Sequence, residues 1–201
     1  MKKSTFRRLT ATCVVSTVVA AGALVSAPAN AATPSSPAPA ALPEAQITAL
    51  TSGIDDSQNI FNGQTALEAG ATAQNVSQFA AGYLAGGGQI KNAVADPTQT
   101  ILMRNVSIKA CKGKNSYDVT GLQANLYINS CKSAEVQKGL LAGAAMATLV
   151  ASVTAATGGG AAAGGVAAAG LSLGAAVIAF KDKGKGVQFW VNPVEVGIRG
   201  Q

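Results

Sequence analysis

Histidine is absent from the 201 residues, aromatic residues make up 4% of them and charged residues 12%. Without histidine, proton transfer would depend on carboxylates or lysines. The sole pair of adjacent carboxylates, Asp55 and Asp56, is interpreted as charge at a helix N-terminus. No metal motif occurs, and the glycine-rich segments lack the strand–turn–helix context and the lysine of a phosphate loop. The sequence therefore predicts a non-enzymatic protein without a cofactor or a metal.

The first 31 residues match a secretory signal peptide. Four basic residues between Lys2 and Arg8 precede an apolar stretch from Leu9 to Val25, and Ala29-Asn30-Ala31 offers small residues for cleavage. We expect cleavage after Ala31 or Ala32. The predicted localisation is secreted, with membrane association after export, and the leader and composition are typical of a bacterial protein.

Two cysteines remain after the leader, which carries Cys13, is removed. Cys111 and Cys131 are an even number of thiols in an exported chain, and a metal site would need more ligands than these two. We expect a structural disulfide that closes a loop of about 20 residues and contributes roughly 3 kcal/mol in the chain-entropy model.

Charge is unevenly distributed along the predicted mature chain. Loss of the leader leaves 11 basic and nine acidic residues, a net charge of +2. Residues 32–97 carry −4 and residues 98–201 carry +6. The cationic and apolar C-terminal half favours an anionic lipid surface over nucleic acid, because only Trp190 and a few tyrosines could stack on bases.

Residues 32–97 divide into a tether and a helical region. Residues 32–43, ATPSSPAPAALP, are rich in proline, alanine and serine and predict a disordered tether. In residues 44–97, Ile47, Leu50 and Ile54 recur at helical spacing, and so do apolar residues from Val76 to Leu84, before three glycines. These patterns predict short amphipathic helices, and Asp96-Pro97 is interpreted as the end of the helical region.

Alternating apolar residues predict strands on both sides of a long uncharged segment. In residues 98–132, Val106 to Ala110 and Leu126 to Ile128 alternate, which predicts a β-hairpin whose strands end at Cys111 and Cys131. In residues 184–201, Val187 to Val191 and Val194 to Ile198 alternate in the same way. The expected fold class is α+β, with a small disulfide-linked antiparallel sheet.

Residues 133–183 predict a hydrophobic helical hairpin. Gly139 to Phe180 are 42 residues without a charge, interrupted by Gly158-Gly159-Gly160. Each arm, 139–157 and 161–180, is long enough as one helix to cross a hydrocarbon core. Ser133 is the expected N-cap, and Lys181, Lys183 and Lys185 follow the second arm. Tip-first insertion would leave these lysines in the headgroups.

Several residues of this hairpin are candidates for membrane contact. Glycines four residues apart allow apolar helices to approach closely in lipid. The predicted contacts are Gly139, Gly143, Gly158, Gly159, Gly160, Gly164, Gly170, Gly174, the three lysines and Trp190. In architecture only, the hairpin resembles that of pore-forming colicins and the glycine-rich helices of membrane-active bacteriocins. The resemblance implies membrane permeabilisation.

The pattern leaves three interpretations of the hairpin open. It is a membrane-active segment, the buried core or self-assembly interface of an interaction protein, or a permanent two-span anchor. Low aromatic content weakens the third, because a belt of Trp and Tyr at both interfaces is missing. The leading hypothesis is a secreted, bacteriocin-like or toxin-like protein that inserts into or docks on anionic membranes. The alternative is a secreted structural or interaction protein that forms homo-oligomers, and neither hypothesis involves nucleic acid.

Overall fold

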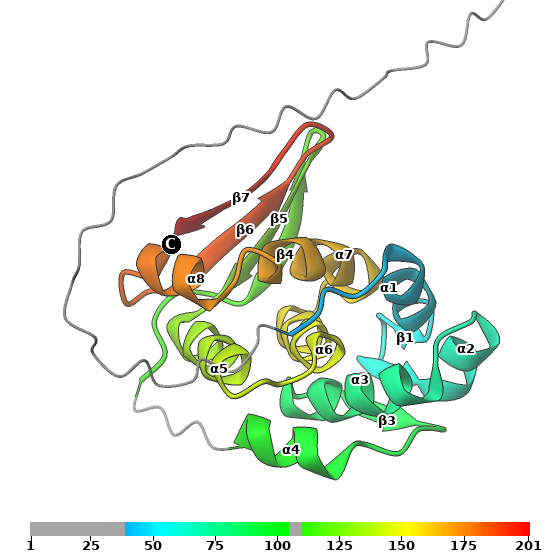
Figure 1. Cartoon of the computed structure of the whole chain (residues 1–201). Helices are drawn as coiled ribbons and strands as arrows, with labels where there is room; N and C mark the ends of the chain where they lie inside the picture. The colour runs from blue at the N-terminus through cyan, green and yellow to red at the C-terminus, as the bar shows by residue number, and fades with distance from the viewer. Residues whose placement is uncertain (1–38, 105–109) are drawn as a thin grey trace, which may run out of the picture. The chain divides into compact units, whose positions relative to one another are not determined.

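The computed structural model describes residues 39–104 and 110–201. The predicted leader, most of the tether and residues 105–109 lie outside this part. Residues 39–43 are coil, and Leu42 packs against the core. The described residues form eight helices, a three-stranded sheet and a four-stranded sheet (Figure 1). The predicted α+β class is thereby confirmed.

The N-terminal half consists of short helices around the three-stranded sheet, in which β1 and β2 pair antiparallel and β2 and β3 pair parallel. Its elements are α1 (Glu44–Thr51), β1 (Ile54–Asp55), β2 (Ile60–Asn62), α2 (Gly63–Glu68), α3 (Ala73–Ala85), β3 (Gln89–Lys91) and α4 (Pro97–Arg104).

The predicted helix around Val76 to Leu84 is confirmed as α3. Thr72 caps it by accepting a hydrogen bond from the Asn75 N–H at 3.2 Å, and Gly86 is the C-cap after its last residue, Ala85. Ile54, in contrast, lies in β1 and not in the first helix. That helix ends at Thr51, and Gly53 two residues later lies close to β2, where its carbonyl oxygen accepts from the Asn62 N–H at 2.7 Å.

The interpretation of Asp96-Pro97 as the end of the helical region is wrong, because a helix begins there. One oxygen of Asp96 accepts from the N–H groups of Thr98 and Gln99 at 2.8 and 3.1 Å. Pro97 is the first residue of α4, where its fixed φ fits a helix and its missing N–H costs nothing.

The four-stranded sheet is antiparallel throughout, in the order β4-β5-β6-β7. Its strands are β4 (Ser116–Thr120), β5 (Gln123–Ile128), β6 (Val187–Val191) and β7 (Val196–Gly200). The strands predicted near Leu126, from Val187 and through Ile198 are confirmed. Most of the strand predicted from Val106 to Ala110 lies outside the described residues.

The partner of β5 differs from the predicted one. Ala110 and Cys111 are coil, and β4, which begins at Ser116, pairs with β5. The reason is the tight turn at Gly121 and Leu122, which joins the paired residues Thr120 and Gln123 and places Gly121 at a φ of +61°. Neither cysteine ends a strand, because Cys131 lies in the first turn of a helix.

The predicted hairpin with two long arms is four short helices: α5 (Ser130–Leu141), α6 (Met146–Thr157), α7 (Gly160–Leu171) and α8 (Ala175–Lys181). Gly143 and Gly174, at φ values of +77° and +86°, lie in the connections that interrupt each arm. The first helix begins before Ser133, because the Asn129 side chain caps it by accepting from the Lys132 N–H at 2.9 Å.

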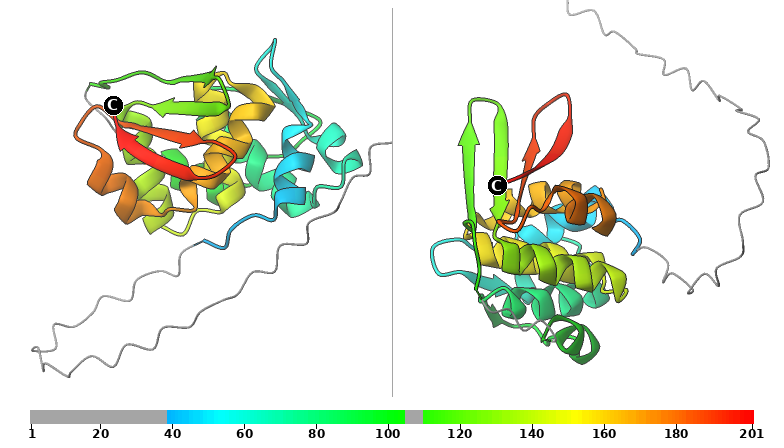
Figure 2. Two further views of the ribbon diagram at one scale, coloured as in Figure 1. Left: turned by 90° about the horizontal axis from the view of Figure 1, so that it is seen from above. Right: turned by 90° about the vertical axis from the view of Figure 1, so that its left-hand side faces the viewer.

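Helix α6 lies in the centre of the described fold. Ten of its 12 residues are buried. It packs between α3 on one side and α7 and the four-stranded sheet on the other (Figures 1 and 2). Gly82 and Gly86 allow α3 to approach closely, because a Cβ at either position would collide with a backbone carbonyl oxygen of α6, that of Thr148 or Ser152.

Candidate functional site

Helix α8 carries an exposed aromatic side chain at its end. Ile178 is buried in the core, and α8 packs on α5. Phe180 is 79% exposed and Val177 is also exposed. The Lys181 Nζ lies 5.6 Å from the centroid of the Phe180 ring. We call Val177, Phe180, Lys181, Lys183 and Lys185 the α8 patch.

The lysines of the α8 patch stand on an ordered turn. One oxygen of Asp182 accepts from the N–H groups of Gly184 and Gly186 at 2.8 and 2.9 Å. Both glycines have φ values near +90°, 84° and 91°, which a residue with a Cβ rarely adopts. The turn therefore fixes the direction in which the chain leaves α8 and enters β6.

Two further lysines lie beside this turn. Gly113, between Lys112 and Lys114, is in contact with the backbone carbonyl of Lys185. The Gln201 side chain accepts from the Lys114 N–H at 3.1 Å and donates to the Ile128 and Val187 carbonyls at 2.8 and 3.2 Å. Lys114 also covers the Tyr127 ring, at 3.9 Å from its centroid. The start of β6 is therefore cationic.

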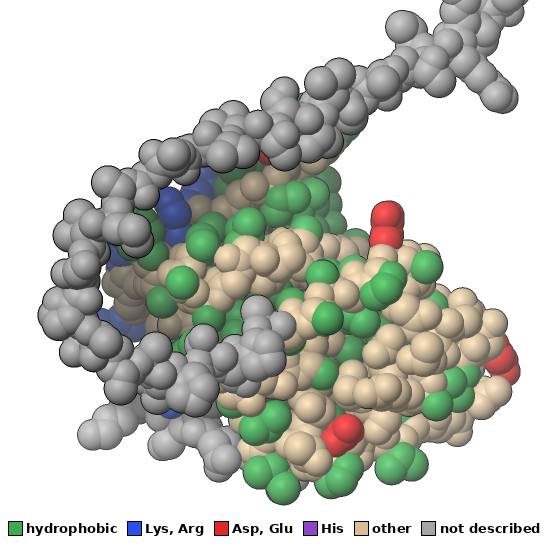
Figure 3. Space-filling model, viewed as in Figure 1, with side chains coloured by type: hydrophobic (Ala, Val, Ile, Leu, Met, Phe, Trp, Pro, Cys, Tyr) green, Lys and Arg blue, Asp and Glu red, His purple; other side chains and the backbone are tan. Residues whose placement is uncertain are grey.

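Basic side chains are concentrated in one region of the face shown in Figure 3. In Figure 3 the blue side chains of lysine and arginine gather at the left, near α8 and the sheet, whereas red acidic side chains occur singly elsewhere. An exposed aromatic group followed in the chain by three lysines combines an apolar contact with attraction to anions. This combination is typical of proteins that lie in the headgroup region of a membrane.

The structure packs most of the predicted membrane-contact glycines against other side chains. Gly139 faces Leu149, Gly159 faces Tyr117, Gly160 faces Asp56, Gly164 faces Thr51 and Gly170 faces Phe189. Gly143 and Gly158 are exposed, and Gly174 precedes α8. Trp190 lies over Gly197 in the four-stranded sheet. Of the predicted contacts, Lys181 ends α8, and Lys183 and Lys185 lie in the turn that follows it.

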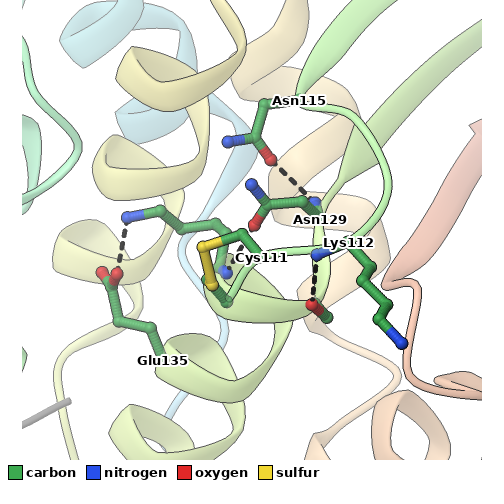
Figure 4. Close-up of a disulfide and its surroundings, with 8 residues drawn as sticks. Cys111, Lys112, Asn115, Asn129 and Glu135 are labelled. Atoms are coloured by element: carbon green, nitrogen blue, oxygen red, sulfur yellow. Dashed lines mark hydrogen bonds and ion pairs between the residues drawn. A yellow bond between two sulfur atoms is a disulfide. The ribbon is translucent and has the colours of Figure 1, made fainter. Parts of the chain in front are cut away.

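Cys111 and Cys131 lie at disulfide distance, with their Cα atoms 5.1 Å apart (Figure 4). The predicted pair is therefore present. The bridge links the coil before β4 to the first turn of α5, and the Lys112 N–H donates to the Ser130 Oγ at 2.9 Å beside it. Together these contacts fix the base of the sheet to α5.

A buried ion pair follows the disulfide in α5. The Lys132 Nζ lies 2.7 Å from the Glu135 Oε2, and both side chains are largely buried. Burial raises the pKa of Glu135, and the nearby ammonium of Lys132 opposes that shift. The ion pair joins adjacent turns of α5. Opposite charges three residues apart are a sequence signal for such a contact within a helix.

The adjacent carboxylates Asp55 and Asp56 make separate contacts. Asp56 Oδ1 accepts from the Ala161 N–H at 3.3 Å, in the first turn of α7. Asp56 therefore supplies negative charge at a helix N-terminus, as the sequence predicts, but the helix is α7 and does not follow Asp56 directly in the chain. Asp55 instead accepts from the Ser57 hydroxyl at 2.6 Å, and this bond lowers its pKa. Within the described ranges, no three His, Cys, Asp or Glu side chains converge to hold a metal ion.

An apolar groove of about 550 Å³ runs between α1 and α7. Alanines and Gly165 of α7 line one side, and Ile47 of α1 and Met146 line the other. Glu44 supplies its one charge.

Within the described helices, no single one is both long and apolar enough to cross a bilayer. Helices α7 and α8 meet the length and composition limits only as a pair, bent by 97° at their connection.

Comparison with known proteins gives no match to a protein family, to a characterised protein or to a solved structure.

Proposed function

We propose that this chain is a secreted, non-enzymatic protein that docks on anionic membrane surfaces through the α8 patch. The observation that carries the proposal is Phe180, which is 79% exposed and directly followed by Lys181, Lys183 and Lys185. Transfer of an aromatic ring from water to the lipid interface is favourable, and each lysine adds about 1 kcal/mol near an anionic surface.

Docking by α8 requires no change in the rest of the fold. Insertion of α6 and α7 would remove Leu149, Val150 and Val153 from the core that they form with α3 and the sheet. Such an insertion would also separate Gly82 and Gly86 from the α6 backbone. The packing therefore favours docking at the surface over tip-first insertion of the hairpin.

The test is binding of the exported chain to vesicles of phosphatidylcholine, with and without phosphatidylglycerol, at low and high salt. We expect binding to the anionic vesicles that weakens as salt rises, because the Debye length shortens. Phe180→Ser should weaken binding about tenfold or more, since a buried aromatic side chain contributes roughly 1.5–3 kcal/mol.

The matched control is Ile101→Ser, which removes another largely exposed apolar side chain, on α4. It should bind as the parent protein does. Equal binding to neutral and anionic vesicles, or equal losses in the two variants, would refute docking through the α8 patch.

A further inference from the structure

The free end of the four-stranded sheet carries a second exposed apolar surface. Leu122, in the turn between β4 and β5, is 83% exposed, and Val194, in the turn between β6 and β7, is 91% exposed. Val119 and Val196 beside them are also exposed. We call these four side chains the tip patch.

The register of the sheet explains why the tip patch is uncovered. Tyr117, Leu126, Phe189 and Ile198 form one row across the strands, and the row packs on the helices, with Tyr117 against Gly159 and Phe189 against Gly170 of α7. The next row on the same face, two residues nearer the turns, is Val119, Ala124, Val191 and Val196. Its outer members, Val119 and Val196, remain exposed.

The tip patch and the α8 patch lie at opposite ends of this sheet (Figure 1). Strand β6 begins two residues after Lys185 and ends at Val191, one residue before the second turn. The charges at the two ends also differ in sign. Exposed Glu195 lies between Val194 and Val196 of the tip patch, whereas Lys181, Lys183 and Lys185 follow Phe180 in the chain.

We infer that the tip patch of one copy packs on the α8 patch of the next copy. Leu122 and Val194 would cover Phe180 and Val177, and Glu195 would approach the lysines. A contact between two tip patches would instead bring acidic residues together, which disfavours a symmetric pair. Because each copy keeps one free patch of each kind, the contact is heterologous and generates filaments or rings.

The contact is small, so the assembly depends on protein concentration. The four aliphatic side chains, between 41% and 91% exposed, supply much less area than the about 800 Å² per partner of a standard interface. The inference goes beyond membrane docking and does not depend on it. If both hold, assembly covers the surface that docks, and the two compete.

The test is analytical ultracentrifugation of the exported chain over a range of concentrations. The parent protein should form species larger than a dimer, and salt should weaken them. Glu195→Lys and Lys183→Glu, both at exposed positions, should each weaken association about fivefold or more. An equimolar mixture of the two variants should restore it, because each reversed charge then meets an opposite one at both contacts.

The control is a mixture of Glu68→Lys and Lys91→Glu, which reverses exposed charges in α2 and β3 and should leave association unchanged. Circular dichroism should show that all four variants fold. A monomer at every concentration, a mixture that stays dissociated, or sensitivity to Glu195→Lys without sensitivity to Lys183→Glu would each overturn the inference. Vesicle binding by Glu195→Lys distinguishes this result from failure of docking, because that variant leaves the α8 patch intact.

Discussion

A single added methyl group tests whether α6 is held in the protein core. Gly82→Ala in α3 would place a Cβ against the carbonyl oxygen of Thr148, a backbone atom of α6 that no side-chain rotation can move. Overpacking of this kind costs about 1–3 kcal/mol, and the contact with backbone favours the upper end of that range. The better helix propensity of alanine returns at most about 1 kcal/mol.

The matched control is Gly165→Ala in α7, where a new Cβ would meet no atom within 4 Å. There only the propensity acts, so stability should rise by about 0.5–1 kcal/mol. For a domain of this size, 1 kcal/mol corresponds to about 2–4 °C in Tm.

The assay is thermal unfolding followed by circular dichroism. We expect Gly82→Ala to lower Tm by about 2–8 °C and Gly165→Ala to raise it slightly. If both substitutions raise Tm by the same amount, α3 and α6 are not in close contact, and the buried-core account is wrong.

Four further predictions concern the disulfide, the ion pair of α5 and the turn between α6 and α7. Titration of the unfolded, unreduced chain should find no free thiol at Cys111 or Cys131, and reduction should lower Tm by several degrees, since the bridge contributes roughly 3 kcal/mol. In denaturant unfolding, Lys132→Met should lower the free energy of unfolding by about 3–5 kcal/mol, because Glu135 is left buried without its partner. The double variant Lys132→Met with Glu135→Leu should recover most of that loss, because neither buried charge remains. Burial raises the pKa of Glu135 above 4.5, so the native state binds the carboxyl proton more tightly than the unfolded state does. The unfolding free energy of the parent relative to Glu135→Gln should therefore be greatest below pH 4.5 and decline as the pH rises through the raised pKa. A free-energy difference that does not change with pH would contradict the raised pKa. Gly158→Asp places a charge in an exposed turn with no atom within 4 Å, so vesicle binding should equal that of the parent; a large loss would instead support tip-first insertion.

Local patterns in the sequence predicted several elements correctly. The alternation from Val187 to Val191 indicated β6, and the apolar spacing from Val76 to Leu84 indicated α3. The even number of cysteines in an exported chain indicated the pair that the structure brings together. These features depend on residues close together in the sequence or on the number of cysteines, so they can be predicted from one sequence.

The long uncharged segment could not be assigned from composition. A helix surrounded by protein and a helix surrounded by lipid select similar apolar residues. The interruptions at Gly143 and Gly174 depend on positive φ values, which a glycine permits but does not require. The most informative glycine pair, Gly82 and Gly86, lies outside the segment, in the helix that packs on α6.

The α8 patch was only partly predictable. The sequence predicts Lys181, Lys183 and Lys185 at a membrane surface, but it assigns Phe180 to the end of a spanning arm. Its exposure follows from the break at Gly174, which turns α8 by 97° from α7 and directs Ile178 inward in place of Phe180. The tip patch depends on the register of strands that are far apart in the sequence, and no local pattern reports that register.

Hydrogen exchange in the presence of anionic vesicles tests most directly whether the protein docks through α8 with its core intact. The amides of α6 should exchange as slowly with vesicles as without them, and the change in protection should be confined to α8 and to the turn from Asp182 to Gly186. Faster exchange throughout α6 and α7 on vesicles, or no change at α8, would contradict docking of a folded protein through this patch.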